Sequence, residues 1–213
     1  MINLNNKIIL YVETNFLMSI ATGRDAQAIS LLENKPPLLD IAIPSICCME
    51  ALSALEDEQK RRNRLDNEIN LQISQLERDK TSLYAQSLLA NLQESIIANK
   101  RLSNEIQARL FTAFDRIATK AEIIELTADV LKESINANFI TREPTDNLIF
   151  HCIIAHSRWH PTNIKVFLSG NAKEFDLPEI RDVLRNNGIV KYFRNTENFQ
   201  GWLNNQVNNF ENI

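Results

Sequence analysis

The sequence predicts an α/β protein with a three-layer, Rossmann-like architecture, in which a parallel sheet of about five strands is flanked by helices. Five short β-branched or apolar runs, at residues 7–12, 40–43, 123–126, 165–168 and 189–193, are each followed by a helical pattern. Strands that are separated by helices can pair in parallel, because a parallel pair requires a long crossover connection. The order of runs therefore favours a parallel sheet covered on both faces.

The central part of the chain is predicted to be almost entirely helical. No Gly occurs between Gly23 and Gly170, and no Pro occurs between Pro44 and Pro144. Within this stretch, residues 56–119 are rich in Glu, Gln, Asn, Arg, Lys and Leu, and their apolar residues recur at helical spacing. We therefore expect residues 1–55 and 120–213 to form one α/β domain and residues 56–119 to form a helical insertion, either a packed amphipathic hairpin or a dimerisation arm.

Composition and charge narrow the class of protein. The 213 residues include 23 basic and 27 acidic ones, a net charge of −4, which lacks the strongly basic character of a dedicated nucleic-acid binder. A phosphodiesterase is compatible with this balance, since its site needs acids for metal ions. The three cysteines, Cys47, Cys48 and Cys152, are too few and too apolar in context for a disulfide framework and indicate reduced thiols.

Neither a signal peptide nor a membrane helix is expected. The N-terminal apolar run meets Glu13 almost at once and lacks a small-residue cleavage site. No stretch approaches the roughly 18 apolar residues that a membrane helix needs. We expect a cytoplasmic location and no membrane partner.

Four polar residues stand at the ends of apolar runs or interrupt them: Glu13, Glu50, Asp146 and Asn171. In parallel sheets, ligands bind outside the carboxyl ends of the strands, and three of the four follow predicted strands closely. Clustered carboxylates would repel one another without a cation. Oxygen ligands suit Mg²⁺ and Mn²⁺, and two such ions about 3.5 to 4 Å apart can drive phosphodiester hydrolysis. Taken singly, Glu13 and Asp146 are more typical of helix caps, whereas the set together favours a metal site.

The same residues resemble the motifs of the PIN-domain nuclease family. The family opens with a strand leading into Asp-Ser/Thr-Asn, and Val12 is followed here by Glu13, Thr14 and Asn15. Its second acid lies in the helix after the next strand, where Glu50 stands, and its third opens an apolar helix, as Asp146 does. The fourth position follows a strand, and the stretch at that place reads Leu168, Ser169, Gly170, Asn171.

This resemblance implies a PIN fold, one or two Mg or Mn ions, and endonuclease activity on RNA, with single-stranded DNA as a further substrate class. Many small relatives are toxins, so an antitoxin or another protein is an expected partner, beside a role in RNA processing or defence; a homodimer is also open. The alternative is a catalytically weak or inactive PIN-like scaffold that binds RNA or a protein. Two departures favour that alternative: Glu13 replaces an Asp, and Asn171 replaces an acid, which removes one negative charge.

The resemblance also implies roles for individual residues. Glu13, Glu50 and Asp146 are expected to be catalytic metal ligands, with Asn171 as a weaker ligand or substrate contact. Thr14 and Asn15 are expected to orient the first acid by hydrogen bonds. Ser169 is expected to contact the ligand residues rather than the metal ion. A basic cluster provides a weak candidate for substrate binding, although its acidic neighbours are more typical of a solvated helix face: Lys60, Arg61, Arg62 and Arg64.

A zinc site is a further hypothesis from the sequence. Cys152, His156 and His160 recur at every fourth residue and could share one helix face. Against zinc, Pro161 ends the helix beside His160, and the chain has no CxxC pair to complete a structural site. The sequence therefore favours Mg or Mn.

Overall fold

Five parallel strands form one sheet, as the sequence predicts. The computed structural model describes residues 7–211, and side chains up to residue 206; the ends of the expected α/β domain, residues 1–6 and 212–213, lie outside the described residues. The strands are β1 (Ile8–Val12), β2 (Leu39–Pro44), β3 (Glu122–Ile124), β4 (Ile164–Leu168) and β5 (Ile189–Phe193). Their spatial order is β3-β2-β1-β4-β5, and every neighbouring pair is parallel.

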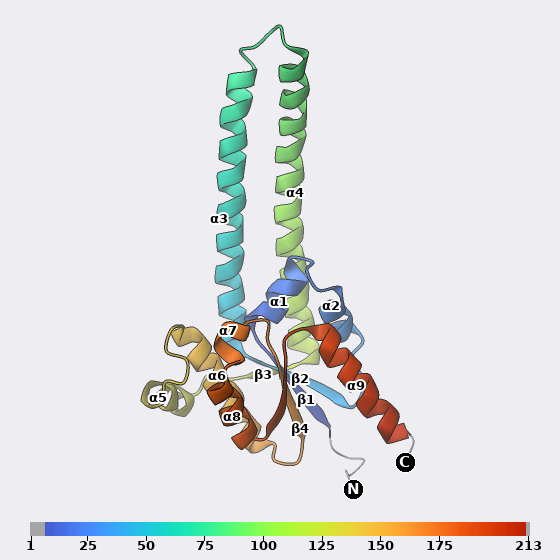
Figure 1. Cartoon of the computed structure of the whole chain (residues 1–213), viewed down its shortest axis with the longest axis vertical. Helices are drawn as coiled ribbons and strands as arrows, with labels where there is room; N and C mark the ends of the chain where they lie inside the picture. Colours follow the sequence, from blue (N-terminus) through green and yellow to red (C-terminus); the bar gives the residue numbers. More distant parts are fainter. Residues whose placement is uncertain (1–6, 212–213) are drawn as a thin grey trace.

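Helices cover both faces of the sheet (Figure 1). On one face, α1 (Thr14–Ala21) packs against the two long helices α3 (Ser45–Leu76) and α4 (Leu83–Lys120), and α2 (Ala26–Glu33) packs against α4. On the other face, α6 (Pro144–Trp159) packs on β2 and β3 and is itself covered by α5 (Ala128–Asn136). This arrangement confirms the predicted three-layer α/β class.

The remaining helices complete the two outer layers. The short α7 (Ala172–Phe175) follows β4, and α8 (Pro178–Asn186) packs against β5. The last helix, α9 (Thr196–Glu211), returns beside α2. All five residues of β1 are buried, which explains why this strand is a continuous apolar run rather than an alternating one.

The two long helices, α3 (Ser45–Leu76) and α4 (Leu83–Lys120), lie side by side and extend far beyond the sheet (Figure 1). We call the part that extends beyond the sheet the arm. The last turns of α4 belong to the core, where Ile106, Leu110, Ala113 and Ile117 are buried. No helix within residues 7–211 combines the length and the apolar character needed to cross a lipid bilayer.

Polar contacts hold the arm helices together. The side-chain amide of Asn99 on α4 donates to the Asp66 carboxylate (2.7 Å) and to the Arg62 carbonyl (3.1 Å) on α3. The Arg62 guanidinium donates in return to the Asn99 side-chain oxygen at 3.0 Å. Asp66 and Asn99 are both buried. The arm interior is therefore specified by a paired polar network as well as by apolar packing.

The sheet has its topological switch point between β1 and β4. From β1 the chain builds outward through β2 to β3, whereas β4 and β5 lie on the other side. Val12 and Leu168 are register partners at the carboxyl ends of these two central strands. The residues that follow them, beginning with Glu13 and Ser169, consequently meet in the crevice where ligands of such sheets bind.

Candidate functional site

A cavity of about 420 Å³ lies at this carboxyl edge of the sheet. We call it the acidic pocket. The structure brings all four polar residues singled out in the sequence to its wall, although they come from four separate parts of the chain. Its lining consists of Glu13, Thr14, Asn15, Met18, Glu50, Ala54, Glu143, Thr145, Asp146, Asn171, Lys173 and Glu174.

Glu13 is held rigidly at the start of α1. It is the N-cap residue of that helix, and its Oε2 accepts the Asn15 backbone N–H at 2.7 Å. The other carboxylate oxygen, Oε1, is buried and finds no hydrogen-bond donor among the residues that the structure describes. Burial raises the pKa of Glu13 to about 7. The hydrogen bond from Asn15 and the nearby Ser169 hydroxyl lower this pKa, whereas the charges of Asp146 and Glu50 raise it. A carboxylate in this position needs a proton or a cation.

Glu50 lies in the second turn of α3, where the helix passes α1. The Thr14 hydroxyl donates a short hydrogen bond to the Glu50 Oε2. This contact corrects the expectation that Thr14 orients Glu13, because its side chain points to the second acid instead. Asn15 does hold Glu13, but through its backbone N–H rather than its side chain.

Asp146 lies in the first turn of α6 and is paired with Asn171. The Asn171 side-chain amide donates to the Asp146 Oδ2 at 2.8 Å. Asn171 also donates its backbone N–H to the Ser169 hydroxyl at 3.0 Å. Burial raises the pKa of Asp146 to about 7, the nearby carboxylates of Glu50, Glu174 and Glu143 raise it, and the hydrogen bond from Asn171 lowers it.

The pocket contains further charged residues that the motifs did not assign. Glu143 is the N-cap residue of α6, and Lys173 and Glu174 lie in α7. Their position directly after Asn171 is the sequence feature that could have identified Lys173 and Glu174 as pocket residues. Asp176, another acid beyond the fourth strand, is buried and paired with the guanidinium groups of Arg181 and Arg194, so it takes no part in the pocket.

The carboxylates line the pocket, but their oxygen atoms are not gathered into one tight cluster. Among the described residues, three ligand-type side-chain atoms from His, Cys, Asp or Glu lie within 4.8 Å of one another only at Glu122, His156 and His160, which are outside this pocket. Mg²⁺ usually retains several waters and binds directly to only one or two carboxylates. The spacing therefore suits a hydrated hard cation better than a closed cage.

The basic cluster of α3 lies away from the pocket. Lys60 is ten residues beyond Glu50, about 15 Å along the helix. Its ammonium pairs with Asp57 at 3.0 Å, and Arg61 and Arg62 both pair with Glu58, at 2.6 and 2.7 Å. Arg64 is exposed. Three of the four basic residues are thus paired with two acids of their own helix.

The fold and site define the class as an α/β protein with a carboxylate-lined pocket at the switch point of a parallel sheet. The sequence matches the model of the PIN domain over residues 10–175, more than half of the chain. The chain therefore belongs to the PIN-domain family, and its scaffold is that of a nuclease family. The comparison with curated proteins found no match to this sequence.

Proposed function

We propose that this protein is a metal-dependent endoribonuclease that cleaves phosphodiester bonds of RNA in the acidic pocket. The observation that carries the proposal is the convergence of Glu13, Glu50, Asp146 and Asn171 on one cavity at the carboxyl edge of a PIN-domain sheet. The catalytic and metal-ligand roles assigned to these four residues are part of the proposal.

The donor set of the pocket fits Mg²⁺ or Mn²⁺. All of the proposed ligand atoms are oxygens, which these hard ions prefer. The buried, unpaired Oε1 of Glu13 supplies a ligand with no competing hydrogen bond among the described residues. The carboxylates of Glu13 and Asp146, which are costly to ionise in the bare pocket, would be stabilised as anions by a cation. A bound ion supplies an activated water at neutral pH and stabilises the developing negative charge on the phosphate oxygens.

Neighbouring residues hold the carboxylates of the site in place, and one lysine adds a positive charge to the pocket. The Asn15 N–H and the Thr14 hydroxyl each hold one carboxylate oxygen, of Glu13 and of Glu50 respectively, and both acids line the pocket. The Asn171 amide holds one oxygen of Asp146. Lys173, the one basic residue among those lining the pocket, is placed to bind a phosphate of the substrate.

A neighbouring cavity of about 200 Å³ extends the proposed substrate path. It shares Asn15 and Met18 with the acidic pocket, and its lining also includes Arg24, Asp25 and Arg194, the last of which pairs with Asp176. An acidic pocket beside a hollow that Arg24 helps to line is compatible with a nucleic-acid backbone that crosses a metal site.

One observation favours the alternative, a weak or inactive scaffold that binds RNA or a protein partner. The Asn171 side chain adds no negative charge and already donates its amide to Asp146. This leaves the pocket with fewer anionic ligands on the β4 side for a second ion. In that case the arm, with exposed Leu71, Leu83 and Tyr84, is the surface for a partner.

The test is cleavage of single-stranded RNA and single-stranded DNA of the same sequence by the full chain, with Mg²⁺, with Mn²⁺ and with EDTA. We expect metal-dependent RNA cleavage and a loss of about 100-fold or more in Asp146→Asn, because a bound metal supplies several kcal/mol. Asp129→Asn is the matched control, since Asp129 also lies in the first turn of a helix but is exposed. Equal cleavage by wild type and Asp146→Asn would refute the assigned site, and cleavage of DNA alone would refute the substrate class.

A further inference from the structure

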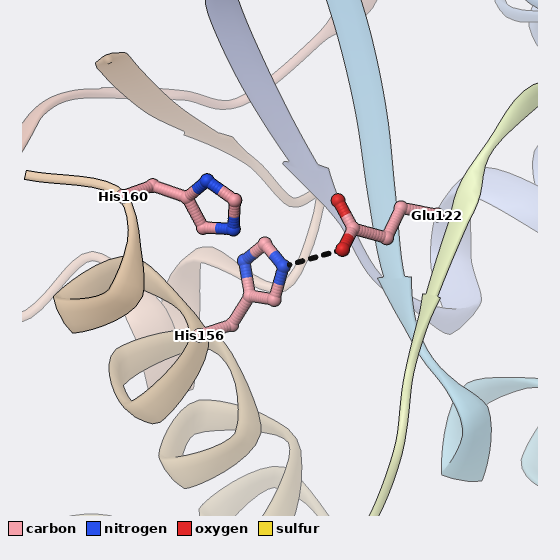
Figure 2. A group of neighbouring side chains, drawn as sticks. All are labelled: Glu122, His156 and His160. Carbon is pink, nitrogen blue, oxygen red and sulfur yellow. Dashed lines mark ion pairs between the residues drawn. The ribbon is translucent and has the colours of Figure 1, made fainter. Parts of the chain in front are cut away.

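A second cluster of ligand-type side chains lies on the α6-covered face of the sheet, away from the acidic pocket. Figure 2 shows Glu122 of β3 facing His156 and His160 at the C-terminal end of α6. Each of the three residues offers one atom, and these atoms all lie within 4.8 Å of one another. His156 is ten residues from Asp146, about 15 Å along α6.

Strand register and helix spacing bring the three together. Tyr11 of β1, Ala42 of β2 and Glu122 of β3 are successive register partners, so their side chains lie at one level of the sheet. His156 and His160 are four residues apart and therefore face the same side at the end of α6. Their rings stack with centroids 4.4 Å apart.

We propose that Glu122, His156 and His160 bind a divalent transition-metal ion of the zinc class. Two imidazoles four residues apart and a carboxylate from another element are a donor set that suits Zn²⁺ and disfavours Mg²⁺. Three protein ligands leave one position for water.

The hydrogen bonding of His156 supports this assignment. Its side chain is nine-tenths buried, and its Nε2 lies 3.1 Å from the Glu122 Oε1. Despite this distance, Nε2 makes no hydrogen bond of good geometry within residues 7–206. The other ring nitrogen, Nδ1, is 2.9 Å from the buried Tyr11 hydroxyl. A ligating histidine commonly donates its second ring N–H to such a partner, which fixes the ring for the metal.

An ion can reach the cluster, and the ligand side chains can move close enough to bind it. A cavity of about 320 Å³ lined by Glu122 and His156 opens beside it. Ligand atoms around a tetrahedral zinc lie about 3.3 Å apart, so a modest inward rotation is needed. The Glu122 side chain is 52% exposed and is free to make it. Cys152 lines the same cavity but is not part of the cluster, so Glu122 takes the place that the sequence pattern had offered to the thiol.

Zinc titration of the full chain, prepared without a polyhistidine tag and with excess Mg²⁺, tests the proposal. Calorimetry should show one Zn²⁺ per chain. Tyr11→Phe should weaken binding by about 10- to 100-fold, as loss of a supporting hydrogen bond does. Glu122→Gln and His160→Gln should each weaken it further. Glu125→Gln, which changes an exposed acid beside the same cavity, is the control that should bind zinc as wild type does.

Two results would overturn the proposal. One is the absence of saturable zinc binding by a wild-type chain whose circular dichroism shows it folded. The other is binding that survives in Glu122→Gln and His160→Gln but is lost in Asp146→Asn, since this would place the ion in the acidic pocket. X-ray absorption at the zinc edge adds an independent readout, with N and O neighbours expected about 2.0 to 2.2 Å from the metal.

Discussion

The side-chain amide of Asn171 donates a 2.8 Å hydrogen bond to the carboxylate of Asp146, joining the turn after β4 to the first turn of α6. This contact places a neutral donor where an acid would face Asp146. It satisfies one oxygen of a buried carboxylate without adding a negative charge to a pocket that already has five acids on its wall.

Replacing Asn171 by Asp should destabilise the metal-free protein by about 1 to 3 kcal/mol, because it removes a donor from Asp146 and adds a like charge. Mn²⁺ should then stabilise Asn171→Asp more than wild type. Thermal unfolding with EDTA and with increasing Mn²⁺ measures both effects. Asn171→Ala, which removes only the donor, is the control; an Asp variant no less stable in EDTA than the Ala variant would contradict the charge argument.

The pH dependence of stability should report the buried acids. Glu13 and Asp146 each have a pKa of about 7 in the fold, above their ordinary values. Between about pH 4 and 7 the folded state therefore binds more protons than the unfolded state, so the free energy of unfolding should fall as pH rises. Melting temperatures in EDTA from pH 5 to 8 should decline, and Glu13→Gln with Asp146→Asn should flatten the decline. Excess Mg²⁺ should flatten it as well, and a flat wild-type profile in EDTA would contradict the predicted shifts.

Thr14→Val should show whether Thr14 acts through its hydrogen bond to Glu50 or only through the space that its side chain fills. Valine keeps the volume of threonine but cannot donate to the Glu50 carboxylate. If the proposed nuclease function holds, activity or metal affinity should fall by about 10- to 100-fold, as for other groups that orient metal ligands. Cleavage rates across a Mn²⁺ titration measure this. Thr14→Ser restores the hydroxyl and should recover most of the loss; equal loss in both variants would assign Thr14 a packing role only.

Lys173 and Lys60 provide a matched pair for substrate contacts. Lys173 lines the acidic pocket, whereas Lys60 lies on α3 and pairs with Asp57. Lys173→Ala should weaken single-stranded RNA binding and reduce the salt dependence of binding by about one counterion. Lys60→Ala should change neither. Fluorescence anisotropy in Ca²⁺ at several salt concentrations measures both, and the reverse pattern would move the proposed binding surface to α3.

The buried pair of Asp66 and Asn99 should contribute measurably to the stability of the arm. Asn99→Ala leaves the Asp66 carboxylate buried without its 2.7 Å donor, at a cost of about 1 to 3 kcal/mol. Asp66→Ala with Asn99→Ala should cost less than the sum of the single changes. Urea unfolding of the three variants completes the cycle, and strictly additive costs would contradict the coupling.

The sequence predicted the sheet because each buried parallel strand is a short apolar run between helical patterns. The absence of Gly and Pro through the centre likewise predicted the long helices, and the PIN-domain membership is confirmed. The assigned roles of Glu13, Glu50, Asp146 and Asn171 stay predictions, although the fold places all four on one pocket.

Contacts between elements could not be predicted in the same way. The Thr14 hydroxyl meets Glu50 only because α3 passes α1 at that turn, which no local pattern specifies. Glu122 begins β3, an edge strand of only three residues, which is too short to give an alternating pattern. The approach of its side chain to His156 therefore could not be predicted from the sequence.

Glu50 and the tip of the arm belong to one uninterrupted helix, since α3 runs from Ser45 to Leu76. At 1.5 Å per residue, the carboxylate and the end of the helix are separated by about 40 Å. The arm therefore sets a fixed distance: a molecule that contacts the tip and the acidic pocket at the same time must span this length. Shortening α3 and α4 by whole turns would shorten the required span by one helical turn at a time.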